Sequence, residues 1–408
     1  MVVGGFICYV AVPMPADRRR LGFVVPRYGA EIVGGAETLA RGFAERLAER
    51  YDVEVLTTCA RDHHTWHDVW PAGEQVENGV TVRRFPVDRR DVGRFLEVQQ
   101  RMSEGFPLAL DEELDWVAGS VNSEGLYETL DRERERFDAL FFLPYLFGTT
   151  LLGAHVDRTR SVLIPCLHDE PFAYLKLVAH LFRSVRAVFF NSAPERSLAR
   201  RLFAVRGEAP VIGFGFDAAE PATAASVAFR SRLGLDGDYL LYFGRKEGGK
   251  NLPLLLESFR RCRGAAGDLS LVVAGDGTID PANDLSGIVD LPRLSEDDKR
   301  AACAGALAVC QPSVNESFSI VLMEAWLQET PVLVNARCPV TCHHAALSNG
   351  GLYFNDPGEF AAEVDYLRRQ PDEARELGSQ GRRYVLDNYT WPVVLERFER
   401  ALQRLLDD

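Results

Sequence analysis

Short apolar runs alternate with longer stretches in which apolar residues recur every three or four positions, along almost the whole chain. Runs such as residues 21–26 and 239–243 have the length and continuous apolar character of strands that are buried on both faces of a sheet. In the longer stretches the apolar positions share one face of a helix, as do Ala36, Leu39, Ala40, Phe43, Ala44 and Leu47. This regular alternation predicts a parallel α/β architecture.

The predicted strands fall into two series of similar length. The first comprises residues 21–26, 53–56, 80–85, 139–143, 161–164, 187–190 and 211–216, and the second comprises 239–243, 269–274, 287–290, 306–310, 331–334 and 351–354. Residues 217–226, with alanines, Glu, Pro and Thr, separate the series and are typical of a linker. We therefore expect an α/β fold of two doubly wound, Rossmann-like domains, 1–217 and 218–390, that face a central ligand cleft. A last predicted helix occupies residues 391–408.

The composition excludes several classes of protein. A hydrophobic content of 47% with 26% charged residues is typical of a soluble globular protein, and the net charge of -13 disfavours a nucleic-acid groove or general adhesion to anionic membranes.

The apolar run at residues 2–12 has no basic region before it, so we expect an extra strand or a frayed leader rather than a signal peptide. The eight cysteines form no Cys-x2-Cys pair, which favours reduced thiols in the cytoplasm. A basic amphipathic helix at residues 195–206 indicates at most peripheral membrane contact, and a solvated helix face is the alternative.

Two glutamates bracket the turn between the predicted strand 306–310 and the apolar helix that follows it. Glu316 lies on the loop and Glu324 inside the helix. The free N–H groups of a helix start favour an anionic ligand, and carboxylates accept hydrogen bonds from hydroxyl groups. A ligand with a phosphate centre and hydroxylated ends, such as a nucleotide sugar, would suit this pocket. The alternative is a solvated helix with two chance glutamates.

A glycine-rich loop with three cations follows the first strand of the second series. It carries Arg245, Lys246 and Lys250, and it lies at the carboxyl end of a strand, where doubly wound sheets bind ligands. In an acidic chain with only four lysines, this loop is typical of a phosphate clamp, and a solvated basic turn is the alternative.

Two loops of the first series are expected to face the same cleft. Residues 34–37 open the first helix, where glycines let a backbone approach a phosphate closely. Residues 168–170 follow the predicted strand 161–164. The alternatives are a tight turn at the glycines and a capping or core role for His168.

These segments, in this order, resemble the motifs of retaining glycosyltransferases of the GT-B fold, family 4 (group 1). The resemblance extends from about residue 21 to the C-terminus and is most specific in residues 239–354. It implies transfer of a sugar from a nucleoside-diphosphate sugar, of the UDP or GDP type, to an acceptor hydroxyl. It also implies a front-face mechanism, in which the departing phosphate oxygen takes the acceptor proton while protein groups position the substrates and stabilise charge. Finally, it implies that the helix at 391–408 packs back on the first domain.

The resemblance also assigns roles to individual residues. The catalytic set is His168, Glu316, Arg245 and Lys250, with His168 orienting the donor sugar rather than acting as a general base. Within the donor site, Arg245 and Lys250 are expected at the diphosphate, Glu316 at a sugar hydroxyl and Glu324 at the ribose. The whole donor-binding set is Gly34, Gly35, Gly244, Arg245, Lys250, Asn251, Gly275, Pro292, Arg293, Leu294, Glu316, Phe318, Ser319, Ile320 and Glu324. The acceptor-binding set is Glu37, Asp169 and Glu170. No metal and no cofactor are expected.

Two departures from the family pattern leave the donor sugar open. Ser319 stands where the family has glycine, and Glu329-Thr330-Pro331 replaces the common x-Gly-x-Pro. As acceptor, a small molecule, a glycan or a lipid-linked compound would each fit. The alternative functions are another GT-B enzyme, such as a sugar-nucleotide epimerase or a glycan phosphorylase, and a non-catalytic nucleotide-sugar binding protein. Zinc is not expected at residues 62–68 or 338–344, because a structural zinc site usually has two pairs of ligands and neither cluster has a second pair.

Overall fold

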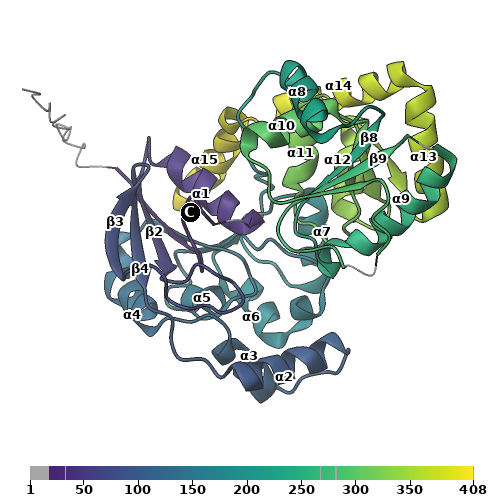
Figure 1. Ribbon diagram of the computed structural model, residues 1–408. Coiled ribbons are helices and arrows are strands. Elements are labelled where there is room, and N and C mark those ends of the chain that lie inside the picture. Colours follow the sequence, from purple (N-terminus) through teal and green to yellow (C-terminus); the bar gives the residue numbers. More distant parts are fainter. Residues whose placement is uncertain (1–17, 33, 267, 281–282, 408) are drawn as a thin grey trace, which may run out of the picture.

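The computed structural model describes residues 18–32, 34–266, 268–280 and 283–407 of the chain, and it contains two α/β units that lie side by side (Figure 1). The extra strand or leader expected at residues 2–12 lies outside the described residues. None of the described helices is long and apolar enough to cross a membrane.

Each unit is built on one largely parallel sheet. The first sheet has the order β3-β4-β2-β1-β5-β6-β7, and the second has the order β10-β9-β8-β11-β12-β13. The pairing of β3 with β4 is antiparallel, and the other strand pairs are parallel. The strands are β1 (Arg20–Val24), β2 (Asp52–Thr58), β3 (Gly73–Glu77), β4 (Val80–Phe85), β5 (Ala139–Phe142), β6 (Ser161–Leu163), β7 (Ala187–Val188), β8 (Tyr239–Phe243), β9 (Ser270–Ala274), β10 (Ile288–Leu291), β11 (Ala308–Gln311), β12 (Val332–Asn335) and β13 (Gly351–Phe354).

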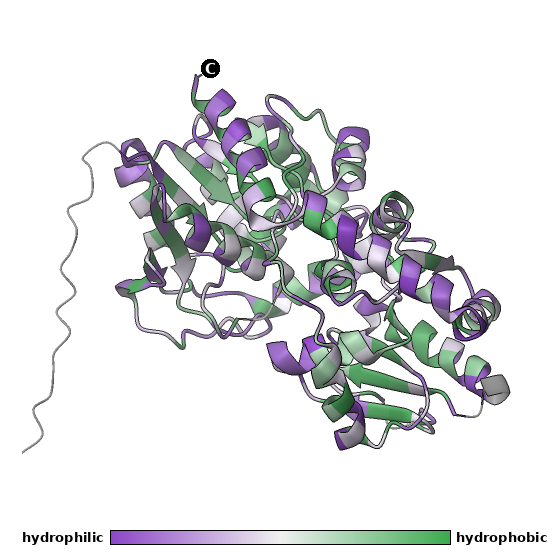
Figure 2. Ribbon diagram, turned by 90° about the horizontal axis from the view of Figure 1, so that it is seen from above, coloured by the Kyte–Doolittle hydropathy of each residue, from purple (hydrophilic) through white to green (hydrophobic). Residues whose placement is uncertain are grey.

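Helices cover both faces of each sheet, and the apolar strands lie beneath helices whose colour alternates between polar and apolar (Figure 2). The first unit contains α1 (Gly35–Leu47), α2 (Val92–Ser103), α3 (Leu110–Gly119), α4 (Glu124–Glu133), α5 (Gly148–Leu151), α6 (Lys176–Ser184) and α7 (Ala193–Leu202). The helices that follow are α8 (Thr223–Leu233), α9 (Leu252–Ala266), α10 (Glu296–Gly305), α11 (Ile320–Leu327), α12 (Pro339–Ser348), α13 (Pro357–Arg369), α14 (Pro371–Asn388) and α15 (Trp391–Asp407). The prediction of two doubly wound, Rossmann-like units is therefore confirmed.

Two strand predictions were wrong. Residues 211–216 form only isolated bridges, from Val211 to Phe190 and from Phe216 to Thr390, because this segment crosses between the units instead of joining a sheet. The edge strand β3 was missed, because its sequence Gly-Glu-Gln-Val-Glu is polar and mostly exposed and shows no core-facing alternation. The expected linker is also shorter than predicted, since α8 begins at Thr223.

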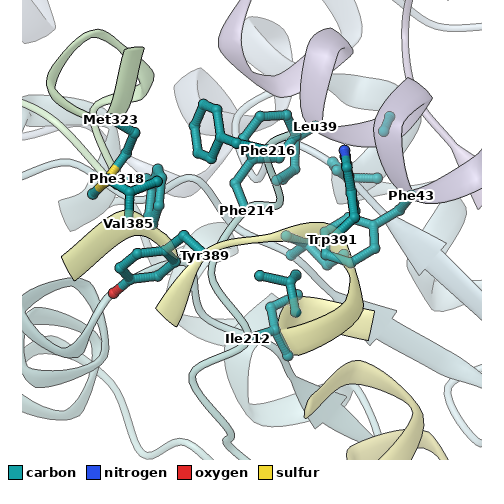
Figure 3. Close-up of a cluster of buried hydrophobic side chains, with 14 of the residues drawn as sticks. Leu39, Phe43, Ile212, Phe214, Phe216, Phe318, Met323, Val385, Tyr389 and Trp391 are labelled. Carbon is teal, nitrogen blue, oxygen red and sulfur yellow. The ribbon is translucent and has the colours of Figure 1, made fainter. Parts of the chain in front are cut away.

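The chain crosses between the two units twice, around Phe214 and again around Trp391. An aromatic cluster packs these two segments against each other (Figure 3). Phe214 contacts Trp391 with ring centroids 5.3 Å apart, and Phe216 stacks on Phe318 at 6.3 Å. The helix α15, which follows the second unit, lies against the first, where Phe398 is 5.0 Å from Phe43. The cluster therefore fixes the start of α11, where Phe318 lies, relative to the first sheet.

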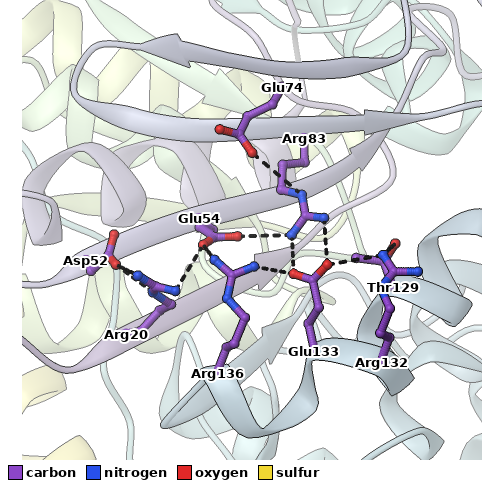
Figure 4. A network of polar contacts seen from close by, with 9 residues as sticks. All are labelled: Arg20, Asp52, Glu54, Glu74, Arg83, Thr129, Arg132, Glu133 and Arg136. Atoms are coloured by element: carbon purple, nitrogen blue, oxygen red, sulfur yellow. Dashed lines mark hydrogen bonds and ion pairs between the residues drawn. The ribbon is translucent and has the colours of Figure 1, made fainter.

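The first sheet also carries a partly buried ion network, in which Glu133 of α4 accepts hydrogen bonds from Arg83, Arg132 and Arg136 (Figure 4). These arginines, Arg83 first, lower the pKa of Glu133 from 4.5 to about 2 against the opposing effect of burial. Because the folded-state pKa is depressed, this contribution to stability is complete above pH 4.5 and is lost as the pH falls towards 2. Because Arg132 and Arg136 are exposed and solvent screens their charges, its size is roughly 1–2 kcal/mol, below what the full shift would give.

We expect Glu133→Gln to lower the free energy of unfolding at pH 7 by roughly that amount, and the difference from wild type to vanish towards pH 2. Urea unfolding at pH 7, 4 and 3 measures it. Glu128→Gln, an exposed change on the same helix, is the control and should have little effect at any pH. A Glu133→Gln difference that stayed constant down to pH 3 would contradict the ion-pair explanation.

Candidate functional site

A cleft of about 410 Å³ lies between the carboxyl ends of the two sheets. In the second sheet the strand order reverses between β8 and β11, and the loops that follow these two strands meet at that point, as is usual for ligand sites in such sheets. The cleft is lined from the first unit by Arg27, Glu31, Ile32, Arg61, Asp62, His63 and His64, and from the second unit by Arg245, Lys246, Glu247, Asp276 and Gly277.

Each glutamate of the Glu-x7-Glu motif is held by a lysine. Lys250 Nζ lies 2.8 Å from Glu316 Oε1, and Lys299 Nζ lies 2.5 Å from Glu324 Oε1. Burial raises the pKa of Glu324, and the neighbouring charge of Lys299 opposes that rise. The structure thus brings together Lys250 and Glu316, two residues of the predicted catalytic set, in an ion pair that the sequence did not predict. It also adds Lys299 of α10, whose only sequence signal is the scarcity of lysine.

The start of α11 lies between these two pairs. Its N-cap residue, Ser319, has φ 71 and ψ 81, in the left-handed region that costs a residue other than glycine roughly 1–2 kcal/mol. Gln311 Nε2, at the end of β11, is 3.3 Å from Ser319 Oγ and also 3.3 Å from Glu316 Oε1. The side chain of Phe318 is buried in the aromatic cluster, so the backbone of residues 318–320 is what this turn offers to a ligand. Gln311 is a second residue that the sequence did not reveal.

The cationic loop after β8 is braced against its neighbours. Arg245 is half-exposed and pairs with Glu247 at 2.9 Å, whereas Lys246 is buried and donates to Leu291 O at 2.7 Å. Lys246 therefore holds the end of β10, where Pro292, Arg293 and Leu294 follow.

Two further contacts fix the position of the cationic loop that follows β8. Asn251 Nδ2 donates to Pro312 O at 3.1 Å, which ties the loop to the Glu316 turn. A Cβ atom on Gly275, which has φ 143, would lie 1.9 Å from Gly244 O, so the close approach of these two loops requires glycine there.

In the first unit, Gly34 and Gly35 open α1 and Glu37 folds back over them. A Cβ atom on Gly34 would lie 2.1 Å from Glu37 Oε2, so this glycine makes room for the carboxylate. Glu37 is buried in an ion pair with Arg27, and Arg27 Nη1 also donates to Arg61 O at 3.1 Å. The pair presents Arg27 rather than Glu37 to the cleft. The carboxylate of Glu37 is thus engaged by Arg27 inside the protein, and its contact with an acceptor stays a prediction.

His168 lies on the loop after β6 with 30% of its side chain exposed, and its Nδ1 is 3.7 Å from Glu170 Oε1. Burial lowers the pKa of His168, Glu170 and Glu316 raise it, and Lys250 and Arg245 lower it further. The four residues of the predicted catalytic set are thus close enough to influence one another, but only Arg245 of the four lines the 410 Å³ cleft; His168, Lys250 and Glu316 do not.

The two residues after His168 have partners of their own. Glu170 accepts from Tyr145 Oη at 2.8 Å. Asp169 is exposed and accepts from Tyr174 Oη at 2.7 Å and from Arg201 Nη2 at 3.3 Å.

Of the two histidine clusters, the one at Asp62, His63 and His64 brings three candidate ligand atoms within 4.8 Å of one another. Asp62 Oδ1, however, already accepts from Thr65 N at 2.8 Å and from His64 N at 3.1 Å. Burial lowers the pKa of His63, and the charges of Arg27 and Arg245 lower it further. The same positive charges oppose a metal cation. No other group of three such ligands was found among the described residues, which include the whole cluster at 338–344.

Residues 227–384 match the family model of the glycosyl transferases group 1. Two curated relatives are the D-inositol 3-phosphate glycosyltransferase of Frankia alni, 36% identical over 35% of this chain and 40% of that protein, and the O-antigen chain mannosyltransferase RfbU of Salmonella typhimurium, 29% identical over 24% of this chain and 28% of that protein. The chain thus spans less than half the length of either relative.

Solved structures are similar over nearly the whole chain. HepE from Anabaena, in complex with UDP-glucose, has a TM-score of 0.69 at 14% identity and covers 95% of this chain and 100% of its own. A sucrose-phosphate synthase from Thermosynechococcus elongatus has a TM-score of 0.70 at 14% identity and covers 96% and 100%. The chain therefore has the GT-B fold, and most of its second α/β unit, residues 227–384, matches the glycosyl transferases group 1 model.

Proposed function

We propose that the protein is a retaining glycosyltransferase that moves a sugar from a nucleoside-diphosphate sugar, of the UDP or GDP type, to an acceptor hydroxyl. The observation that carries the proposal is the pair of lysine-held glutamates, Glu316 with Lys250 and Glu324 with Lys299, on either side of the start of α11 within the residues that match the group 1 model. The similarity to HepE, whose structure contains UDP-glucose, supports a nucleotide-sugar donor.

In this proposal the diphosphate lies at the α11 start, with Arg245 and Lys250 as counter-charges. Glu324 accepts from the ribose hydroxyls and Glu316 from a sugar hydroxyl, while His168 orients the sugar from the first unit. The bond between the anomeric carbon and the phosphate oxygen breaks, and the acceptor oxygen attacks that carbon from the same face. The departing phosphate oxygen takes the acceptor proton, and the cations stabilise the charge that develops on it.

The acceptor is proposed to be a small molecule, a glycan or a lipid-linked compound, bound from the first unit beside Asp169 and Glu170. The cysteines of the described residues are all free thiols, which supports a cytoplasmic location.

Transfer is proposed to need neither a metal nor a cofactor, so activity should survive excess EDTA. The expectation rests on the cations already placed around the helix start, which offset the diphosphate charge without a bound ion. Product formation is compared with and without EDTA, and a His63→Gln variant is the control for the cluster of candidate ligands at residues 62–64. Activity lost in EDTA, regained with a divalent cation and absent from His63→Gln would instead make Asp62, His63 and His64 a metal site.

Calorimetric titration with UDP, GDP, ADP and TDP in EDTA tests the donor site. We expect one nucleotide to bind tightly and selectively, and Glu324→Ala to lose that binding. The matching sugar nucleotides are then offered with an acceptor panel, and NMR reads the anomeric configuration of the product. Selective binding without transfer would favour a non-catalytic nucleotide-sugar binding protein, an inverted product would contradict retention, and no binding to any nucleotide would contradict the donor site.

A further inference from the structure

A buried carboxylate outside the cleft holds the loop that carries His168. Glu195 is the third residue of α7 and is 1% exposed. Its Oε1 accepts from the backbone N–H of Leu167 at 2.7 Å, and its Oε2 accepts from the backbone N–H of Asn191 at 2.6 Å. Leu167 immediately precedes His168, so the first of these bonds acts one residue from the proposed sugar-orienting side chain.

The loop has a conformation that needs such support. Cys166 has φ 52, in the left-handed region that residues other than glycine rarely adopt. Asn191 Nδ2 lies 3.7 Å from Cys166 Sγ and 3.5 Å from Glu195 Oε1. The half-buried Cys166, within the segment that leads to His168, thus contacts the fully buried Asn191, which in turn contacts Glu195.

Helix capping alone does not explain this carboxylate. The cap of α7 is already made by Ser192, whose Oγ accepts from Glu195 N at 3.3 Å. A capping glutamate can also do its work at the surface, whereas this one is buried, which is unfavourable for a charge unless it is well hydrogen-bonded. Burial raises the pKa of Glu195 to about 8, and the backbone N–H groups of Asn191, Leu167 and Ser192 oppose that rise. The contact with Ser192, the N-cap residue, is the one that a capping glutamate makes. The bond to Leu167, 28 residues away in the sequence, is the one that a cap does not require.

We propose that Glu195 is a positioning residue for His168: its bond to the backbone N–H of Leu167 fixes the loop from which the imidazole of His168 extends beside Glu170. The inference rests on the proposed function in that His168 orients the donor sugar. Glu195 touches neither donor nor acceptor, so its loss should disturb the transfer step and leave nucleotide binding in the second unit unchanged.

Glu195→Gln is the test, because it keeps the volume but replaces one accepting oxygen with an NH₂ group that faces an N–H donor. Glu113→Gln is the matched control: Glu113 is also a buried carboxylate of the first unit, 2% exposed, and it accepts from the backbone N–H of Leu177 at 3.0 Å. We expect Glu195→Gln to lower kcat at least about ten-fold, since small misplacements of a positioning group are costly. Nucleotide affinity should stay within about two-fold of wild type, as expected for a change that does not touch the donor-binding unit. Glu113→Gln should change neither.

A readout that does not depend on activity accompanies the kinetics. The His168 Cε1–H resonance, assigned by its disappearance in His168→Gln, should shift in ligand-free Glu195→Gln and stay in place in Glu113→Gln. An unmoved resonance with wild-type kcat would overturn the proposal, as would equal losses in both variants. If the wild type transferred no sugar at all, the proposed function would fail, and the resonance would still decide whether Glu195 positions His168.

Should Glu195→Gln not fold, Glu195→Asp replaces it, because it keeps a carboxyl group that, being one methylene shorter, reaches the two N–H groups less well. A shifted His168 resonance and a lower kcat in this variant, with nucleotide affinity retained, would support the positioning role. Wild-type values for both would overturn it.

Discussion

Replacing Lys250 with alanine should weaken binding of the nucleoside-diphosphate sugar at least about ten-fold, or about 1.4 kcal/mol. Two effects act in the same direction. The substitution removes a cation from the proposed diphosphate site, and it also leaves Glu316, 2.8 Å from the lost ammonium group and only 10% exposed in its side chain, without its ion-pair partner. The unpaired carboxylate then repels the phosphates.

The second effect, repulsion of the phosphates by the unpaired Glu316, can be measured separately from the first. In the double variant Lys250→Ala with Glu316→Gln the repulsion is gone, so affinity for the free nucleoside diphosphate should recover part of the loss seen in Lys250→Ala alone. Calorimetry of the wild type, Lys250→Ala, Glu316→Gln and the double variant measures this coupling. Lys176→Ala is the control, because Lys176 Nζ contacts Leu108 O at 3.3 Å in the first unit. Near-wild-type binding by Lys250→Ala would remove that lysine from the site.

The fold was largely predictable because most strands of both sheets are buried on both faces. In β8, four of the five residues of Tyr-Leu-Leu-Tyr-Phe are buried, so its apolar run is continuous and easily recognised. Burial alone does not make a strand, however. Phe214 and Phe216 are just as apolar, yet they bury their rings against Trp391 and Phe318, which lie more than 100 residues away in sequence. A local pattern cannot distinguish a sheet neighbour from an aromatic partner of this kind.

For the site, sequence reasoning found the loops but not the partners of their side chains. Glu316, Glu324 and Lys250 stand out because they lie at strand ends and helix starts. These positions are already predicted by the alternation of apolar runs with amphipathic stretches along the chain. Lys299 could not be placed in the same way, because its contact with Glu324 depends on how α10 packs against α11.

The ion-pair partner of Glu37 was missed for the same reason. The sequence shows a glutamate beside two glycines, which is compatible with a ligand contact. Only the three-dimensional structure shows that Arg27, ten residues earlier, takes up its carboxylate. Pairing of charged side chains is a tertiary property, and it decides which member of a pair remains available to a ligand.

The division of labour between the two motif glutamates is expected to appear as a difference between ligands. Glu324→Ala should weaken binding of the free nucleotide and of the sugar nucleotide by similar factors, at least about ten-fold, because both ligands carry the ribose. Glu316→Ala should weaken only the sugar nucleotide. Its affinity for the free nucleotide should be unchanged or higher, since Lys250 loses its carboxylate partner and becomes fully available to the phosphates.

The measured quantity is therefore the ratio of the two dissociation constants in each variant, obtained by calorimetry with the nucleotide identified in the first titration. Lys299→Ala should resemble Glu324→Ala, but with a smaller loss, because it leaves the ribose-binding carboxylate in place and removes only the group that orients it. Equal ratios in Glu316→Ala and Glu324→Ala would show that the two carboxylates do not separate sugar from ribose. A Lys299→Ala protein with wild-type affinity for both ligands would show that Glu324 holds its position without the ion pair, through its packing within α11 alone.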